Sequence, residues 1–326
     1  MQKEYDAVGI GNVLIDILAQ VENTCPDKFG LKKGAFNLVD ERKIEEIMDA
    51  IIALNPKFVP AGSVANSVMG ISNLGGKCAF IGRIGRDTHG KFYINQLKKS
   101  GVDPKLKECD LSATGRCLSL ITPDHERTFA VNLGAASNLS KQDISEDYVK
   151  KSKILHITGY EIESAKDAIF HAVEVAQKNN IKISFDLADP FLIERRRSDL
   201  KKILNNSVNF VFANEAEAKA FTGFEDPADA IDELSKYATI SIVKTGVKGS
   251  LVRSGNKTIQ IPAYATRVVD TTGAGDLYAA GFLWAYTQGK DLELWGKVGA
   301  LMASKVISQV GAIIAEPMRG EVEKIN

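Results

Sequence analysis

Asp270-Thr271-Thr272-Gly273-Ala274-Gly275-Asp276 separates an apolar segment of β character, residues 264–269, from an apolar segment of helical character, residues 277–286. Small residues at positions 273–275 leave backbone N–H groups unshielded where this helix would begin. The first turn of a helix has unsatisfied N–H donors and the positive end of the helix dipole, so the stretch predicts a site for phosphate oxygens. Asp276 would place a base beside that anion, as phosphoryl transfer to an alcohol requires.

The same stretch also fits a purely structural interpretation. A Gly-x-Gly sequence before a helix is often only a tight turn, and an aspartate in the first turn is often only a cap. Taken alone, residues 270–276 leave both interpretations open. The remainder of the chain has to decide between them.

Composition excludes several classes of protein. The 326 residues are 44% apolar and 25% charged, as in a globular protein, and 41 basic residues balance 41 acidic ones. Such a chain has no overall electrostatic field that would attract nucleic acid or an anionic membrane, so we expect neither as a partner.

The N-terminus lacks the apolar core of a signal peptide, and no run approaches the roughly 18 apolar residues of a membrane span. We therefore expect a cytoplasmic protein, with its four scattered cysteines reduced. Its four scattered histidines lack the spacing of a zinc site.

After residue 140 the chain alternates between short apolar strands and helices, which predicts an α/β fold with a mainly parallel sheet covered on both faces. Ligands of such sheets bind at the carboxyl ends of the strands. The polar residues at predicted strand ends are Asp186, Asn214 with Glu217, and Lys244. The predicted strands are 154–158, 182–186, 210–213 and 240–244, and the predicted helices are 164–179, 193–205, 215–221 and 228–237.

The first part of the chain contains more β character. Residues 114–122 and 127–132 alternate as two strands of a predicted hairpin, joined by residues 123–126. Asp16 interrupts the apolar run 13–21. Burying a lone carboxylate there would be costly without a partner, so Asp16 either faces a ligand or points outward at a strand end.

A second loop of small residues, 60–67, opens a predicted helix that continues to residue 74. Gly62 and Ser63 permit close approach of a backbone or a ligand, and Asn66 lies in the first turn. The loop is either a polar clamp for sugar hydroxyls or a tightly packed helix start.

Two further glycine-rich stretches resemble nucleotide-binding motifs but do not match them. Gly9-Ile10-Gly11 begins a dinucleotide fingerprint, but Leu14 replaces its third glycine. Residues 85–91 nearly spell a P-loop, but Phe92 stands where Ser or Thr would hold Mg²⁺.

Two further motifs follow predicted strands. Asn214 and Glu217 can form a capping box, or can hold the water shell of Mg²⁺. The turn at residues 245–249 has two glycines that would let a nucleotide lie against the backbone, a weak signal by itself.

Together and in this order, these elements resemble the ribokinase-like (PfkB) carbohydrate kinase family, which includes the adenosine kinases. The resemblance extends from Gly11 to about Pro317, and Asp270–Asp276 is similar to the C-terminal signature of the family. Ala61 departs from it, because many members have a second glycine there. The resemblance implies a three-layer αβα core of residues 1–11, 42–110 and 135–326. It also implies a small β-sheet lid of residues 12–41 and 111–134 over the acceptor site.

The resemblance also implies a role for each matching position. Asp276 would be the catalytic base, and the backbone of Gly273, Ala274 and Gly275 would form the anion hole. Asn214 and Glu217 would organise Mg²⁺ through water, and whether a monovalent cation such as K⁺ near Asp270 and Thr272 assists is left open. The implied ATP-binding residues are Asn214, Thr245, Gly246, Gly249, Gly273 and Gly275, and the implied acceptor-binding residues are Asn12, Asp16, Gly62, Ser63, Asn66, Arg127 and Leu133.

Within the family, residues 11–16, 127–136 and 306–311 look like the adenosine-kinase version. The resemblance thus implies an ATP-dependent kinase for the primary hydroxyl of a nucleoside, adenosine before others, yielding AMP. The alternative is a kinase for ribose, fructose or 2-keto-3-deoxygluconate. A non-catalytic nucleotide or sugar sensor is a further alternative, against which the presence of Asp276 argues. Either a monomer or a homodimer is compatible with the sequence.

Overall fold

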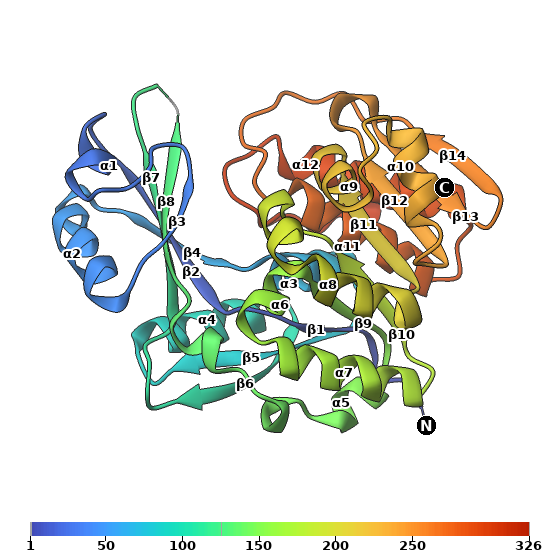
Figure 1. Cartoon of the computed structure of the whole chain (residues 1–326), viewed down its shortest axis with the longest axis horizontal. Helices are drawn as coiled ribbons and strands as arrows, with labels where there is room; N and C mark the ends of the chain where they lie inside the picture. The colour runs from blue at the N-terminus through green and yellow to red at the C-terminus, as the bar shows by residue number, and fades with distance from the viewer. Residues whose placement is uncertain (1, 125, 326) are drawn as a thin grey trace.

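The computed structural model describes residues 2–124 and 126–325, which form a large part around a nine-stranded sheet and a smaller part around a five-stranded sheet (Figure 1). The strand order of the large sheet is β14-β13-β12-β11-β10-β9-β1-β5-β6. Seven strands, β12 through β6 in that order, are parallel, whereas β13 and β14 are antiparallel. Their bounds are β1 (Tyr5–Ile10), β5 (Cys78–Gly85), β6 (Val102–Cys109), β9 (Ser152–Thr158), β10 (Lys182–Asp186), β11 (Phe210–Asn214), β12 (Ile240–Lys244), β13 (Ser250–Ser254) and β14 (Lys257–Ile261).

Helices cover both faces of this sheet, which confirms the predicted three-layer αβα arrangement. The central strands are buried almost throughout, because a parallel sheet is covered on each side. One face packs against α3 (Ser63–Asn73), α4 (Thr88–Lys99), α11 (Ala274–Thr287) and α12 (Leu292–Val306), with α13 (Arg319–Glu323) beyond them. The other face packs against α5 (Glu146–Lys150), α6 (Gly159–Ser164), α7 (Lys166–Lys178), α8 (Pro190–Ser207), α9 (Glu215–Thr222) and α10 (Pro227–Leu234).

The small sheet has the strand order β3-β8-β7-β2-β4. Its antiparallel pair β7 and β8 confirms the predicted hairpin strands, although His125 of the connection lies outside the described residues. The bounds are β2 (Leu14–Gln20), β3 (Phe36–Leu38), β4 (Lys57–Ala61), β7 (Gly115–Ile121) and β8 (Arg127–Asn132).

The small part also includes residues 42–61, which the family resemblance places in the large domain. Helix α2 (Glu41–Ile51) packs its buried isoleucines against the small sheet, and α1 (Cys25–Lys28) lies on the same side (Figure 1). Buried Arg116 of β7 forms ion pairs with Glu41 and Glu45 of this helix. Strand β4 then completes the edge of the sheet beside β2.

Within residues 2–124 and 126–325, the chain crosses between the two parts four times, at residues 11–13, 62, 110–114 and 133–134. At these crossings the backbones of neighbouring segments lie in direct contact. A Cβ on Gly62 would lie 2.5 Å from the carbonyl oxygen of Asn12, and φ of Gly62 is +113°. Only glycine tolerates both the contact and this conformation.

Side chains of the large part hold three of these crossings. The backbone N–H of Asn12 donates to Glu161 Oε1 at 3.1 Å. Tyr93 Oη donates to the carbonyl oxygen of Ala61 at 2.9 Å. The backbone N–H of Thr114 donates to Asp87 Oδ2 at 2.7 Å. The position of the small sheet is therefore defined by hydrogen bonds as well as by apolar packing.

The expectation of a strand at residues 264–269 is wrong. This segment has no strand partner, and Val268 and Val269 are about half exposed. The backbone N–H of Val269 donates to Ile307 at the end of α12. Tyr264 and Val268 instead line a pocket, so the apolar character of the segment serves a cavity wall and not a sheet.

Candidate active site

The predicted anion hole lies at the N-terminus of α11, which begins directly after Gly273. Gly273 is the N-cap and has φ of +78°, and a Cβ there would lie 2.5 Å from the Cβ of Ala312. The glycine is required by both its conformation and its packing. The backbone N–H of Ala274 donates to the carbonyl oxygen of Thr271 at 3.2 Å. The N–H groups of Gly275 and Asp276 have no acceptor among the described residues, so they can bind phosphate oxygens.

Asp276 lies in the first turn of α11 and is held by residues of α3 more than 200 positions away. Its Oδ1 accepts from Ser63 Oγ at 2.5 Å, and its Oδ2 accepts from Asn66 Nδ2 at 2.8 Å. Burial raises the pKa of Asp276, although the Ser63 and Asn66 hydrogen bonds oppose that shift. Residues 60–67 and 270–276, which the sequence analysis treated separately, therefore meet in the structure. Their contact fixes the orientation of the Asp276 carboxylate.

Two strand ends bring further charges beside this carboxylate. Lys244 Nζ, at the end of β12, is 2.9 Å from Asp186 Oδ2 at the end of β10. A Cβ on Gly275 would lie 2.9 Å from the same Nζ. Lys244 and Asp186 were noted at strand ends in the sequence but received no role there. A charged residue at the carboxyl end of a parallel strand was the available signal.

Asn214 and Glu217 form the reciprocal capping box at the start of α9. Asn214 Oδ1 accepts from the Glu217 backbone N–H at 2.8 Å, and the Glu217 carboxylate accepts from the Asn214 backbone at 2.8 Å and from its amide group at 2.6 Å. Glu217 is buried, and burial raises its pKa while the Lys244 charge opposes the shift. The capping interpretation is thus correct, and it leaves the Mg²⁺ interpretation open.

The acidic side chains near Lys244 can be tested as a binding site for a divalent cation. In the described residues, no group of three or more His, Cys, Asp or Glu side chains is placed to hold a metal directly. Yet the carboxylates of Asp186, Glu217 and Asp276 all lie close enough to the ammonium of Lys244 to raise its pKa. This excess of buried negative charge fits a cation that keeps its own water ligands, as Mg²⁺ commonly does.

Asp270 was considered as a site for a monovalent cation, but its carboxylate is already occupied. Oδ1 accepts from the backbone N–H and the hydroxyl of Thr272, at 3.0 and 2.7 Å. Oδ2 accepts from the Gly311 backbone at 2.9 Å and lies 3.1 Å from Arg127 Nη2. These hydrogen bonds outweigh burial and lower the pKa of Asp270. The side chain does not fit K⁺ in this arrangement.

The acceptor residues predicted from the sequence lie on both sides of the junction between the parts. Asp16, on β2, accepts from Ser119 Oγ of β7 at 2.6 Å, and burial raises its pKa. Arg127, on β8, donates to Thr272 Oγ1 at 2.9 Å and so reaches the loop before α11. Ser119 was not identified from the sequence, because the pairing of β2 with β7 is not visible there.

The remaining predicted acceptor residues lie at the crossings. Gly62 abuts the carbonyl of Asn12, and Asn12 Oδ1 accepts from Ser164 Oγ at 2.8 Å. The buried Glu161 that binds the Asn12 backbone was not identified from the sequence. Leu133 is half-buried at the last crossing, where a Cβ on Gly115 would lie 2.6 Å from its carbonyl oxygen.

A pocket of about 600 Å³ adjoins the carboxylates and extends away from the small sheet. Among the predicted residues, it is lined by Ser63, Asn214, Glu217, Gly246, Gly249, Gly273, Ala274, Gly275 and Asp276. Thr245 is buried behind it, and its backbone N–H donates to the carbonyl of Gly249 at 2.8 Å. The outer walls, not foreseen from the sequence, come from Tyr160, Val247, Tyr264, Val268, Ala303 and Ile307. Polar groups at one end and apolar walls at the other suit a nucleotide.

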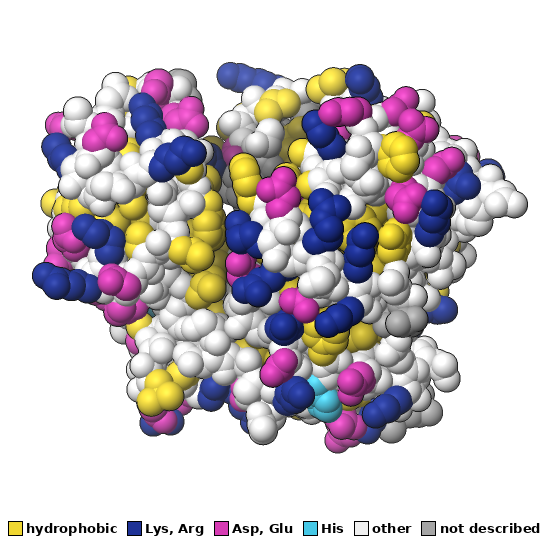
Figure 2. Space-filling model, in the orientation of Figure 1, with side chains coloured by type: hydrophobic (Ala, Val, Ile, Leu, Met, Phe, Trp, Pro, Cys, Tyr) yellow, Lys and Arg dark blue, Asp and Glu magenta, His cyan; other side chains and the backbone are white. Residues whose placement is uncertain are grey.

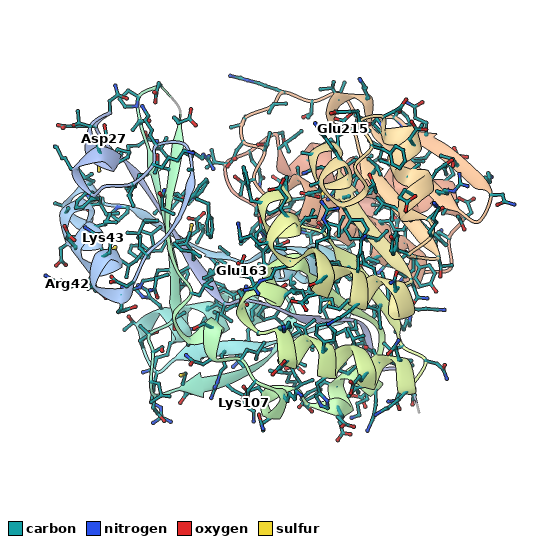
Figure 3. The ribbon with its side chains drawn as sticks, in the orientation of Figure 1. Asp27, Arg42, Lys43, Lys107, Glu163 and Glu215 are labelled. Atoms are coloured by element: carbon teal, nitrogen blue, oxygen red, sulfur yellow. The ribbon has the colours of Figure 1, made fainter. Side chains whose placement is uncertain are left out.

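The molecular surface is hollowed between the two parts, and hydrophobic side chains line the wall on the side of the small sheet (Figure 2). Glu163 lies beside this cleft on α6, whereas Asp27, Arg42 and Lys43 lie on the far side of the small part (Figure 3). Arg195 Nη2 is 2.7 Å from Glu163 Oε2. No helix in the described part of the chain is long and apolar enough to cross a membrane.

Two curated relatives are similar to nearly the whole chain, and both are kinases. An adenosine kinase of Saccharomyces cerevisiae is 29% identical over 325 residues, covering 93% of this chain and 95% of the relative. A 5-dehydro-2-deoxygluconokinase of Bacillus licheniformis is 28% identical over 344 residues, covering 99% of this chain and 96% of the relative.

Solved structures agree with the fold. A probable sugar kinase from Rhizobium etli superposes with a TM-score of 0.92 at 29% identity, covering 99% of each chain. The adenosine kinase from Sinorhizobium meliloti superposes with a TM-score of 0.91 at 32% identity, covering 99% of this chain and all of the other. The pfkB family carbohydrate kinase model matches residues 28–319. The protein therefore belongs to the pfkB family of carbohydrate kinases and is a phosphotransferase with an alcohol group as acceptor.

Proposed function

We propose that this kinase transfers the γ-phosphoryl group of ATP to the primary hydroxyl of a nucleoside, with adenosine as the preferred acceptor and AMP as product. The observation that carries the transfer chemistry is the Asp276 carboxylate, held by Ser63 and Asn66 beside the N-terminus of α11. A base next to an anion hole is what an in-line transfer to a hydroxyl needs.

In this proposal each part of the site has one task. The acceptor binds at the junction of the two parts, with Asp16, Asn12 and Asn66 available for its hydroxyl groups. Asp276 removes the proton of the attacking hydroxyl, and the backbone N–H groups of Gly275 and Asp276 stabilise the charge of the phosphoryl oxygens. ATP lies in the pocket along Gly246, Gly249 and the apolar walls. Asn214 and Glu217 would hold hydrated Mg²⁺, which neutralises phosphate charge when bound.

Electrostatics at the acceptor side favour a neutral acceptor over a sugar acid. Arg127 is the cation among the predicted acceptor residues, and its guanidinium is already committed to Thr272 and Asp270. The carboxylate of a sugar acid would therefore meet Asp16 without a free cationic partner. The apolar wall of the cleft on the small-sheet side is compatible with the flat face of a purine (Figure 2).

A sugar kinase is the second candidate, because relatives of both kinds cover nearly the whole chain. The two are separated by measuring ADP release with adenosine, other nucleosides, ribose, fructose, 2-keto-3-deoxygluconate and 5-dehydro-2-deoxygluconate. We expect adenosine to give a kcat/KM at least about tenfold above the others. If adenosine is inert while a sugar or sugar acid turns over, the nucleoside assignment is wrong and the kinase assignment stands.

A further inference from the structure

We infer that Lys244 is a catalytic residue of this site, whose ammonium group binds the transferred phosphoryl group, and that Asp186 is the residue that positions it. The inference rests on the proposed phosphoryl transfer. It adds a side-chain cation to an anion hole otherwise made of backbone N–H groups.

The position of Lys244 follows from the order of the strands. Lys244 ends β12 and Asp186 ends β10, with β11 between them, so the lysine side chain reaches across the end of β11. The Lys244 side chain is 15% exposed and the Asp186 side chain 8%. An ammonium group this enclosed has few orientations, and its remaining open side is the pocket that both residues line.

Gly275 shows where the ammonium group points. A Cβ at this second residue of α11 would lie 2.9 Å from Lys244 Nζ. The ammonium therefore lies directly against the first turn of the helix, within hydrogen-bonding distance of the place where phosphate oxygens would meet the N–H groups. A side chain at position 275 would separate the two sources of positive charge.

Placing an ammonium against a helix N-terminus is electrostatically unfavourable, because both are positive. Burial would also lower the pKa of Lys244, but the charges of Asp186, Glu217 and Asp276 outweigh it and keep the group protonated. The Lys244 ammonium and the N-terminus of α11 are therefore two positive groups held side by side, where both can contact one anion. Such a preorganised arrangement stabilises charge that develops during the reaction.

Asp186 is anchored independently of Lys244. Its Oδ1 accepts from the backbone N–H of Ala188 at 3.0 Å. Ala188 has φ of +74°, an uncommon conformation for a residue with a Cβ, and it lines the same pocket. The carboxylate is thus fixed from the loop after β10, which leaves Oδ2 free to orient the lysine.

The step is balanced without further reactants. The acceptor oxygen forms a bond to the γ-phosphorus as its proton moves to the Asp276 carboxylate. The bond from that phosphorus to the bridging oxygen breaks, and ADP leaves with the electron pair. Lys244 exchanges no proton; its N–H groups donate to phosphoryl oxygens throughout.

The test compares Lys244→Met with wild type and with Lys257→Met, an exposed lysine at the start of β14. We expect kcat of Lys244→Met to fall about 10²- to 10³-fold. ADP has no γ-phosphoryl group, so its Kd, measured by calorimetry, should stay within about threefold of wild type. Lys257→Met should match wild type in both. A kcat of Lys244→Met within about threefold of wild type overturns the inference.

The double variant Asp186→Asn/Lys244→Met separates catalysis from structure, because it removes both buried charges and leaves no unpaired ion. Turnover is expressed per mole of ADP-binding protein, so misfolded material does not enter. We expect the double variant to unfold like wild type and to remain about 10²-fold slower. Recovery of turnover in the double variant would show a structural pair and overturn the inference. If wild type phosphorylates no acceptor, the proposed function fails and this inference fails with it.

Discussion

Replacing Asp276 with asparagine isolates the proton-accepting role of this carboxylate. The present hydrogen bonds are those from Ser63 Oγ at 2.5 Å and from Asn66 Nδ2 at 2.8 Å. An asparagine amide can keep both, since its oxygen can accept from Asn66 while its NH₂ group donates to the serine hydroxyl, which then acts as acceptor. The substitution thus preserves the shape and the hydrogen bonds, and removes the base.

The expected magnitude follows from that role. General-base catalysis contributes about 10²- to 10⁴-fold, so kcat of Asp276→Asn should fall by at least about a hundredfold. This corresponds to about 3–5 kcal/mol of activation free energy. Binding of ADP should change little, because the backbone N–H groups of α11 remain.

The free energy of unfolding should not fall when Asp276 is replaced with asparagine. Burial raises the pKa of Asp276 above its ordinary value. A carboxyl group with a folded-state pKa above its unfolded-state pKa destabilises the fold progressively as pH rises through that interval. The neutral amide avoids this cost, so the free energy of unfolding of Asp276→Asn at neutral pH should equal or exceed that of wild type.

The assay measures ADP release with the acceptor that wild type prefers, together with ADP affinity by calorimetry and urea unfolding at neutral pH. Single-turnover measurements exclude a limit set by product release. If Asp276→Asn binds ADP normally and keeps kcat within about tenfold of wild type, Asp276 is not the base.

Two further substitutions test the junction between the parts. Arg127→Ala removes the hydrogen bond to Thr272 and leaves buried Asp270 without its cation, so the KM for the acceptor should rise and the free energy of unfolding should fall by about 1–3 kcal/mol. Asp270 has a lowered pKa, so the loss of unfolding free energy should be full at neutral pH and shrink as pH falls; a loss that grows on acidification would contradict this. Burial raises the pKa of Glu161 from 4.5 to about 7, so its ionisation destabilises the fold as pH rises through that interval. Glu161→Gln should abolish on the order of 3 kcal/mol of this decline in urea unfolding between about pH 5 and 8, and an unchanged decline would exclude Glu161 as its source.

The alternating half of the fold could be predicted because its signals are local. Strands 182–186 and 240–244 are short apolar runs that end in a charged residue, and the structure has them with the same bounds. The sequence does not predict strands β4 and β6, because they contain Pro60 and Pro104, which argue against a strand. Both lie at the edge of a sheet, where proline is tolerated because one side of the strand has no partner. Edge position depends on strand order, which periodicity does not reveal.

Features of the site that are local in the sequence could likewise be predicted, whereas contacts between distant residues could not. The helix start after Gly273 and the capping pair Asn214 with Glu217 are local features, and the structure has both. The union of Asp276 with Ser63 and Asn66 could be expected only through resemblance to a family. The contact of Lys244 with Asp186 was not expected at all, because it requires knowing that one strand separates theirs.

The four crossings of the chain have a consequence for how such a protein can change. On the proposed assignment, the groups that perform the transfer lie in the large part, whereas Asp16, Ser119 and Arg127 come from segments 14–61 and 115–132 of the small part. Mutations in those two segments can alter the shape offered to an acceptor while the phosphate-binding machinery keeps its geometry. Substrate preference and catalytic power can therefore diverge separately within one continuous chain, without the insertion of a new domain.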